Sequence, residues 1–228
     1  RGYSKSAGNA YYEEYLRGMS QKELLKIIRS LNQEINRLKG ELENSELNPT
    51  VMVFPDSLTR IKYEREYLEM AKMAYEDVGG NYKPTRSERL DQEFNESLKH
   101  MKRFIFNYGG FFKGYEKRTY TLSGDTVLFD LTHSFYLKPS NLPIYEPFTR
   151  DEFIRGIAKL HIGEWKKEYN NHNTLDGIKW SIDIEYDDKI DLVHIVNGRN
   201  AFPYNFDELL EFLGIDNEEH DNDESDEQ

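Results

Sequence analysis

The sequence predicts an α+β protein, because its apolar pattern changes from helical to alternating and then combines both. Apolar residues recur at helical spacing up to about residue 100. From there to about residue 137 they alternate and are rich in β-branched and aromatic types, which is typical of strands. A helix, a hairpin and a further helix are expected after residue 148. With 16 Tyr and 13 Phe, the chain has enough large side chains to form a core.

Four helices are expected before the first strand. A short helix is closed by Gly18, and the next begins sharply because Ser20 and Glu23 fit a capping box. Gly79 and Gly80 end the third helix, and the fourth leads directly into the strand region. The predicted helices span residues 7–17, 20–43, 57–78 and 87–100.

A β-meander follows, with strands expected at 103–108, 117–122 and 126–131. Gly109-Gly110 indicates a turn or a bulge, and Ser123-Gly124-Asp125 a hairpin turn. The stretch "KPSNLPIYEP" (138–147) contains three prolines and indicates a boundary loop.

A compact module is expected after that loop. Thr149 and Glu152 form a second capping box, which opens a helix predicted to reach Tyr169. "IKWSIDIEY" alternates cleanly and "IDLVHIV" continues the hairpin, while Asn205 is placed to cap the closing helix. The expected organisation is an arm with an oligomerising helix (1–47), helices with the meander (48–147), the α-β-β-α module (148–215) and a disordered acidic tail (216–228).

The net charge of −12 comes mostly from that tail, "DNEEHDNDESDEQ", which carries eight acidic residues and no Lys or Arg. Residues 1–215 therefore keep a charge of −4, and a large basic surface for nucleic acid is disfavoured. The tail is expected to be solvated, although it could also mimic nucleic-acid phosphates in a basic cleft.

The helix 20–43 carries the most regular pattern in the chain. Its apolar residues fit heptad positions a and d, with β-branched Ile at two a positions and Leu at every d position, a combination that favours parallel two-stranded coiled coils. Glu34 and Lys39 then occupy g and e positions and would pair between copies. The predicted homodimer seam consists of Leu24, Ile28, Leu31, Ile35, Leu38 and Leu42. The alternative is an intramolecular αα-hairpin with helix 57–78.

Aromatic and basic residues interleave in the meander, as they do on sheets that stack single-stranded nucleic acid. The same pattern is typical of a half-buried sheet with basic residues toward solvent. The residues that would contact nucleic acid or another partner are Arg103, Tyr108, Phe112, Lys113, Lys117 and Arg118.

No catalytic, cofactor or metal site is predicted. The chain has no cysteine, which excludes disulfides, thiolate ligands and a cysteine nucleophile. "HIGEW" could place His161, Glu164 and Glu168 on one helical face, but a second matching pair is missing from the sequence. "NNHN" (170–173) invites comparison with metal nucleases, yet the helix there precedes the hairpin instead of following it. Solvated surfaces are the simpler interpretation.

Two segments resemble uncharacterised accessory proteins of Gram-positive bacteria, their phages and mobile elements. They are the arm "RGYSKSAGNAYYEEY" and the module containing Trp165, Tyr169, "DGIKW" and "NGRNAFPYNFDELLEFL". The resemblance covers about a third of the chain and implies a context, not a chemistry. That context includes anti-CRISPR-type inhibitors of bacterial defence nucleases.

We therefore expect a non-catalytic protein that binds another macromolecule, in a phage or mobile-element setting. Its partner would be a protein such as a nuclease effector, and the chain itself would be a homodimer. A nucleic-acid-binding regulator is the alternative, and a metal-dependent nuclease the third. The apolar runs are too short to cross a membrane and no signal-peptide pattern is visible, so we expect the host bacterial cytoplasm.

Overall fold

The computed structural model describes residues 7–44, 56–110, 114–134, 148–171, 177–187 and 193–215, and its class is α+β. The chain divides into two compact units, residues 1–84 and 85–228. These boundaries differ from those expected at residues 47 and 147. The helix predicted at 57–78 packs with the helix predicted at 20–43 in the first unit, and the meander shares one sheet with the C-terminal hairpin in the second. The predicted tail lies outside the described residues.

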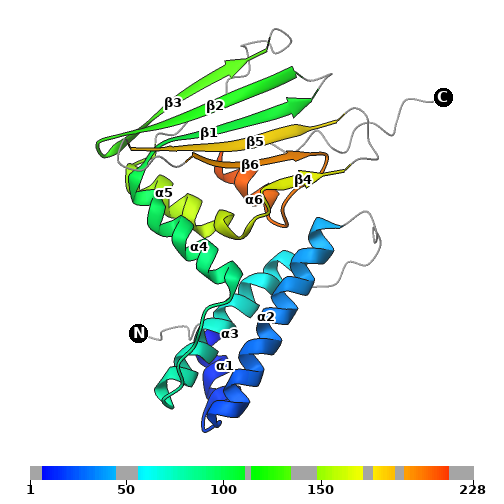
Figure 1. Ribbon diagram of the computed structural model, residues 1–228, viewed down its shortest axis with the longest axis vertical. Helices are drawn as coiled ribbons and strands as arrows, with labels where there is room; N and C mark the ends of the chain where they lie inside the picture. The colour runs from blue at the N-terminus through cyan, green and yellow to red at the C-terminus, as the bar shows by residue number, and fades with distance from the viewer. Residues whose placement is uncertain are drawn as a thin grey trace, which may run out of the picture. The chain divides into compact units, whose positions relative to one another are not determined.

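The first unit is helical (Figure 1). It contains α1 (Ala7–Tyr11), a π-helical turn η1 (Tyr12–Leu16), α2 (Gln21–Glu43) and α3 (Ser57–Asp77). The capping box at Ser20 is present, since its side chain accepts from the Glu23 amide and Glu23 accepts from the Ser20 amide. Gly18 and Gly79 have φ of 78° and 82°, values that favour glycine and end a helix. The predicted starts and stops of these helices are thereby confirmed to within a turn.

Helices α2 and α3 form an antiparallel hairpin. Gln21 at the start of α2 donates to the carbonyl of Val78 beyond the end of α3, at 2.6 Å. Further along α2, Glu34 accepts from Arg60 near the start of α3, at 2.7 Å. The face that α3 contributes to the buried core consists of Ile61, Leu68, Ala71 and Ala74.

The predicted seam is buried inside the single chain. Leu24, Ile28, Leu31, Ile35 and Leu38 are each at most 7% exposed, and Leu42 is half-buried. These side chains consequently form the core of the α2–α3 hairpin, which is the intramolecular alternative stated above. The physical reason for placing a second copy on this seam disappears with that finding, and the predicted homodimer is left without the observation that motivated it.

The second unit is a six-stranded sheet with helices packed on one of its faces (Figure 1). The strand order is β3-β2-β1-β5-β6-β4, antiparallel throughout except for β4 beside β6. The helical elements are α4 (Arg86–Ser97), η3 (Leu98–His100), α5 (Arg150–Lys159), η5 (Ile162–Glu164) and α6 (Phe206–Phe212). The strands are β1 (Met101–Gly110), β2 (Gly114–Ser123), β3 (Thr126–His133), β4 (Glu168–Asn170), β5 (Lys179–Tyr186) and β6 (Val193–Arg199).

Strand alternation sends one set of side chains toward these helices. Phe104 pairs with Tyr120 on one side and Ile184 on the other, and all three are buried. The ring of Phe104 lies 5.8 Å from that of Phe153 on α5. The alternation expected from Ile178 to Tyr186 is confirmed within β5, where Trp180, Ile182, Ile184 and Tyr186 are buried, whereas Ile178 precedes the strand and is half-buried. The meander is confirmed as well, with its hairpin turn at Gly124 at φ 58°.

Three details of the module differ from expectation. The helix predicted to reach Tyr169 ends at Lys159, because His161 adopts a left-handed conformation and a short 3-10 turn follows. A short strand, β4, then adds to the sheet beside β6. Asn205 stands at the start of α6 but makes no side-chain cap, since its amide is used elsewhere.

None of the helices in the described part of the chain is long and apolar enough to cross a bilayer.

Candidate functional site

The alternation of β1 and β2 separates the four described residues among the six predicted to contact a partner. Arg103 and Lys117 lie on the sheet face away from the helices, whereas Tyr108 and Arg118 lie on the helix-covered face. Phe112 and Lys113 lie outside the described residues. A sheet face that combines aromatic stacking with basic contacts is therefore not formed by the four described members of this set.

Tyr108 and Arg118 have structural contacts instead. The Tyr108 ring stacks on Phe106, with centroids 5.8 Å apart. Arg118 is 4% exposed and donates to the carbonyl of Leu213 at 2.7 Å and to Glu116 at 2.6 Å. A buried guanidinium needs such acceptors, so this side chain ties β2 to the end of α6.

The uncovered face of the sheet carries mainly polar and charged residues, together with Ile105 and the exposed Leu128. We call it the open sheet face and define it by Arg103, Lys117, Thr119, Thr121, Asp183 and Glu185. Arg103 and Glu185 are cross-strand partners and form an ion pair at 3.2 Å. Burial raises the pKa of Asp183, opposed by Lys117 and reinforced by Glu185. Positive and negative groups thus largely pair with one another on this face.

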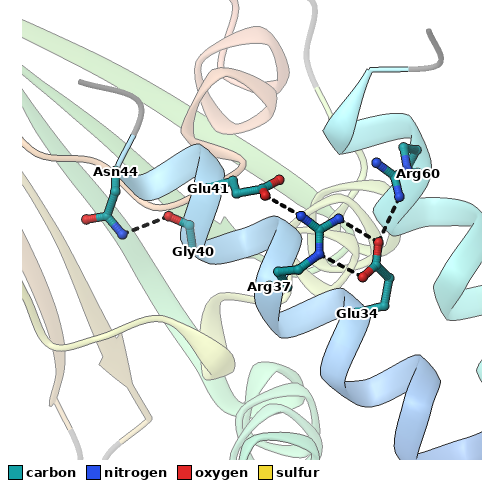
Figure 2. A network of polar contacts seen from close by, with 6 residues as sticks. All are labelled: Glu34, Arg37, Gly40, Glu41, Asn44 and Arg60. Atoms are coloured by element: carbon teal, nitrogen blue, oxygen red, sulfur yellow. Dashed lines mark hydrogen bonds and ion pairs between the residues drawn. The ribbon is translucent and has the colours of Figure 1, made fainter. Parts of the chain in front are cut away.

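The predicted seam pair, Glu34 and Lys39, is also accounted for within the chain. Figure 2 shows the Glu34 carboxylate held from two helices: Arg37 donates to both of its oxygens, at 2.7 and 2.8 Å, and Arg60 on α3 donates at 2.7 Å. Arg37 also reaches Glu41. These hydrogen bonds, chiefly that from Arg37, lower the pKa of Glu34. Lys39 is half-buried.

Four tyrosines gather on the surface of the first unit. Tyr11 of α1 stacks on Tyr67 of α3 with ring centroids 4.2 Å apart, and Tyr15 and Tyr63 extend the cluster at 5.3 and 6.5 Å. Tyr15 and Tyr63 are 53% and 42% exposed. We call Tyr11, Tyr15, Tyr63 and Tyr67 the tyrosine patch. Burial raises the pKa of Tyr11, and a hydrogen bond to Glu14 raises that of Tyr15, so both hydroxyls stay protonated at neutral pH.

A cluster of possible metal ligands lies in the second unit, between α4 and η5. Asp91, His161 and Glu164 each offer a ligand atom, and these atoms lie within 4.8 Å of one another. His161 Nδ1 is 2.7 Å from Asp91 Oδ2. Sequence reasoning identified His161 and Glu164 but placed them on a helix and missed Asp91. Asp91 could not be found from the sequence pattern around His161, because the two residues are brought together only by the packing of α4 against this turn.

The C-terminal residues on which part of the resemblance rests converge in the core of the second unit. Trp165 donates to Asn205 at 3.1 Å, and Trp180 donates to the carbonyl of Ala201 at 3.0 Å. Gly177 lies against the Asn200 side chain so closely that a Cβ there would come within 1.8 Å of its oxygen. These residues thus make packing contacts that join η5, β5 and the start of α6.

Comparison with known proteins gives no relative: no family model, no curated protein and no solved structure matches the chain.

Proposed function

We propose that this chain is a non-catalytic protein-binding module, and that the tyrosine patch on α1, η1 and α3 is its contact surface. The observation that supports the proposal is the exposure of stacked aromatic rings at the surface of the first unit. Tyrosine is enriched at protein interfaces because it offers a large rigid area, a hydroxyl for hydrogen bonding and little side-chain entropy to lose.

The chemistry of the patch favours a protein over nucleic acid. The segments that carry its two exposed rings have acidic residues beside basic ones: Glu14 adjoins Tyr15, and Tyr63 lies between Lys62 and Glu64, so these neighbours do not form a purely basic surface for phosphates. On the open sheet face, Arg103 is already paired with Glu185, and Lys117 has the carboxylate of Asp183 nearby. Of the aromatic residues that the structure describes in the meander, Phe104, Phe106 and Tyr120 are buried, Tyr108 and Phe129 are half-buried, and Tyr115 is exposed. Among the described residues of the predicted set, rings and cations thus do not gather on one face, which favours the protein-binding proposal over the nucleic-acid alternative.

The resemblance suggests the identity of the partner. A bacterial defence nuclease, bound and inhibited in the host cytoplasm, is the specific form of this proposal. It rests on the arm that contains Tyr11 and Tyr15 and on the C-terminal module, both of which resemble accessory proteins of phages and mobile elements.

The proposal is tested by affinity capture from a Gram-positive host lysate, followed by identification of the captured protein. The double variant Tyr15→Ala, Tyr63→Ala is expected to lose most of the captured protein, because truncating a hot-spot tyrosine costs about 2 kcal/mol or more. Tyr115→Ala is the matched control, since Tyr115 is similarly exposed, at 40%, but lies on the strand β2. Equal capture by the double variant and the wild type would contradict the assignment to this patch.

A further inference from the structure

Asp91 is a charged residue that is buried where α4 packs against η5, which is unusual for a carboxylate. It lies on α4 and is 8% exposed, beside the buried Phe94 on the same helix. Its two carboxylate oxygens differ in their hydrogen bonding. Oδ2 is 2.7 Å from His161 Nδ1 and accepts from Asn95 Nδ2 at 3.3 Å. Oδ1 is buried and has no hydrogen-bond partner in the described part of the chain.

A buried carboxylate oxygen without a partner is costly, because it has lost its hydration without replacement. Native structures rarely leave such atoms unsatisfied, and an exception calls for a proton, a water molecule or a cation. Two further groups beside Asp91 favour the cation. They are an imidazole and a second carboxylate, and both are ordinary metal ligands.

The turn that carries His161 and Glu164 has a backbone conformation that lets it pack closely against α4. His161 has φ of 51° and ψ of 40°, a left-handed conformation that is uncommon for a residue with a Cβ. Gly163 lies so close to α4 that a Cβ there would come within 2.6 Å of the Asp91 Cα. Backbone strain of this kind is maintained when surrounding contacts demand it. Here it brings His161 and Glu164 against Asp91.

We propose that Asp91, His161 and Glu164 form a binding site for a divalent transition-metal ion of the Zn²⁺ class. One imidazole and two carboxylates suit Zn²⁺ or Mn²⁺ better than Ca²⁺, which takes oxygen ligands alone. Ligand distances of about 2.1 Å would place the ligand atoms about 3.4 Å apart in a tetrahedral site. Reaching these separations needs two small adjustments: His161 Nδ1 and Asp91 Oδ2, now 2.7 Å apart, would move apart, and the partly exposed Glu164 would turn toward the ion. Asn95, which donates to Asp91, would orient the ligand.

The role of such an ion is to hold α4 against the turn that follows α5. Asp91 and His161 are far apart in sequence, so a shared ion closes a long loop and stabilises the second unit. The site is separate from the tyrosine patch, which belongs to the other unit. Its existence therefore does not depend on the proposed function.

The test is titration of the chelator-stripped, full-length protein with ZnCl₂ by calorimetry, with thermal melts in parallel. We expect one tight equivalent of Zn²⁺ and a rise in melting temperature of about 5 °C at saturation. Co²⁺ should give visible d–d absorption bands at the same stoichiometry, which report the coordination geometry. Asp91→Asn and His161→Asn should each weaken Zn²⁺ affinity by more than about 100-fold, since losing a ligand exceeds the effect of losing an outer partner. Asparagine also tolerates the left-handed conformation at position 161.

His100→Gln is the matched control. His100 also contacts a carboxylate, Asp187 at 3.3 Å, but the two belong to no cluster of three ligands among the described residues. Its substitution should leave the tight equivalent unchanged. Glu164→Gln, outside the buried core, should weaken binding at least about tenfold and keeps the test decisive if the other substitutions disturb folding, which circular dichroism monitors. A wild type without a stoichiometric equivalent, or binding that persists in Asp91→Asn and His161→Asn, would overturn the proposal.

Discussion

The indole nitrogen of Trp165 donates to Oδ1 of Asn205 at 3.1 Å, inside the second unit. Asn205 is 2% exposed, and its amide nitrogen donates in turn to the carbonyl of Leu160 at 2.9 Å. One buried amide thus satisfies both an indole and the carbonyl at the end of α5. It does so from the first residue before α6, where the sequence alone indicated an ordinary helix cap.

Replacing Asn205 with Leu should destabilise the second unit by about 2–4 kcal/mol, because two buried polar groups lose their partner at about 1–3 kcal/mol each. Urea denaturation followed by Trp fluorescence measures the loss. Asn170→Ala is the control, since Asn170 is exposed on β4 and its substitution should change stability by less than about 0.5 kcal/mol. Similar midpoints for both variants would mean that the Asn205 amide contributes little.

The elements that the sequence predicted well are those whose signals are local. Capping boxes at Ser20 and Thr149, the glycine stops after η1 and after α3, and the alternation along β5 all depend on residues within one or two turns of each other. The end of α5 was placed ten residues too late, since its stop is the left-handed His161 and no glycine or proline marks it. Local propensity contains no information about the packing that imposes that conformation.

The pairing partners could not be predicted for a related reason. Strand β1 lies between β2 and β5, so residues of the meander and of the C-terminal hairpin form one sheet across a long connection. Alternation fixes which face a side chain occupies but not which strand lies beside it. The same limit hid Asp91, whose neighbours His161 and Glu164 come from beyond the meander.

The burial of the α2 stripe leads to a matched pair of substitutions. Leu38 is fully buried whereas Leu42 is half-buried, although both belong to the same heptad pattern. Leu38→Ala should destabilise the first unit by about 2–5 kcal/mol, and Leu42→Ala by about 1 kcal/mol or less. The effects should be independent of protein concentration. Sedimentation velocity at several concentrations, combined with thermal melts, checks both points. A concentration-dependent melting temperature would instead restore the intermolecular seam.

The carboxylate of Glu34 makes the stability of the α2–α3 hairpin depend on pH. Its pKa is lowered by the hydrogen bonds from Arg37 and by the charge of Arg60. Stability from a lowered pKa is fully present above the unfolded value, about 4.3, and is lost as pH falls through the folded value. Glu34→Gln should therefore cost about 0.5–1 kcal/mol at pH 7 and less at pH 3. Urea titrations at the two pH values measure this difference. Equal losses at both would show that packing, not charge, holds the contact.

The pH dependence of stability that comes from Asp183 should have the opposite sign to that from Glu34. Burial raises its pKa, so the charged form opposes folding at pH values above the folded pKa, and the penalty disappears below the unfolded pKa of about 3.9. Asp183→Asn should leave stability unchanged at pH 3 and raise it at pH 7, by less than about 1 kcal/mol. Asn107 donates to Ser181 at 2.9 Å and would still do so in the variant. A loss of stability at pH 7 would show that the attraction of Lys117 outweighs burial.

Two glycines in helical segments should respond to alanine with opposite signs. Gly40 lies on α2, where a Cβ added to it would meet no heavy atom within 4 Å, and its carbonyl accepts from Asn44 at 2.8 Å (Figure 2). Gly40→Ala should stabilise the first unit by about 0.5–1 kcal/mol, because alanine loses less backbone entropy in a helix.

Gly163 offers no such space, since its added Cβ would lie 2.6 Å from the Asp91 Cα and 2.7 Å from the Leu90 carbonyl. Both are backbone atoms and cannot rotate away. Gly163→Ala should therefore push η5 from α4, cost about 1–3 kcal/mol and separate Asp91 from His161. Thermal melts of the two variants compare the signs directly. If Gly163→Ala were as stable as the wild type, α4 would have room to move, and the close approach would not be what positions His161 and Glu164.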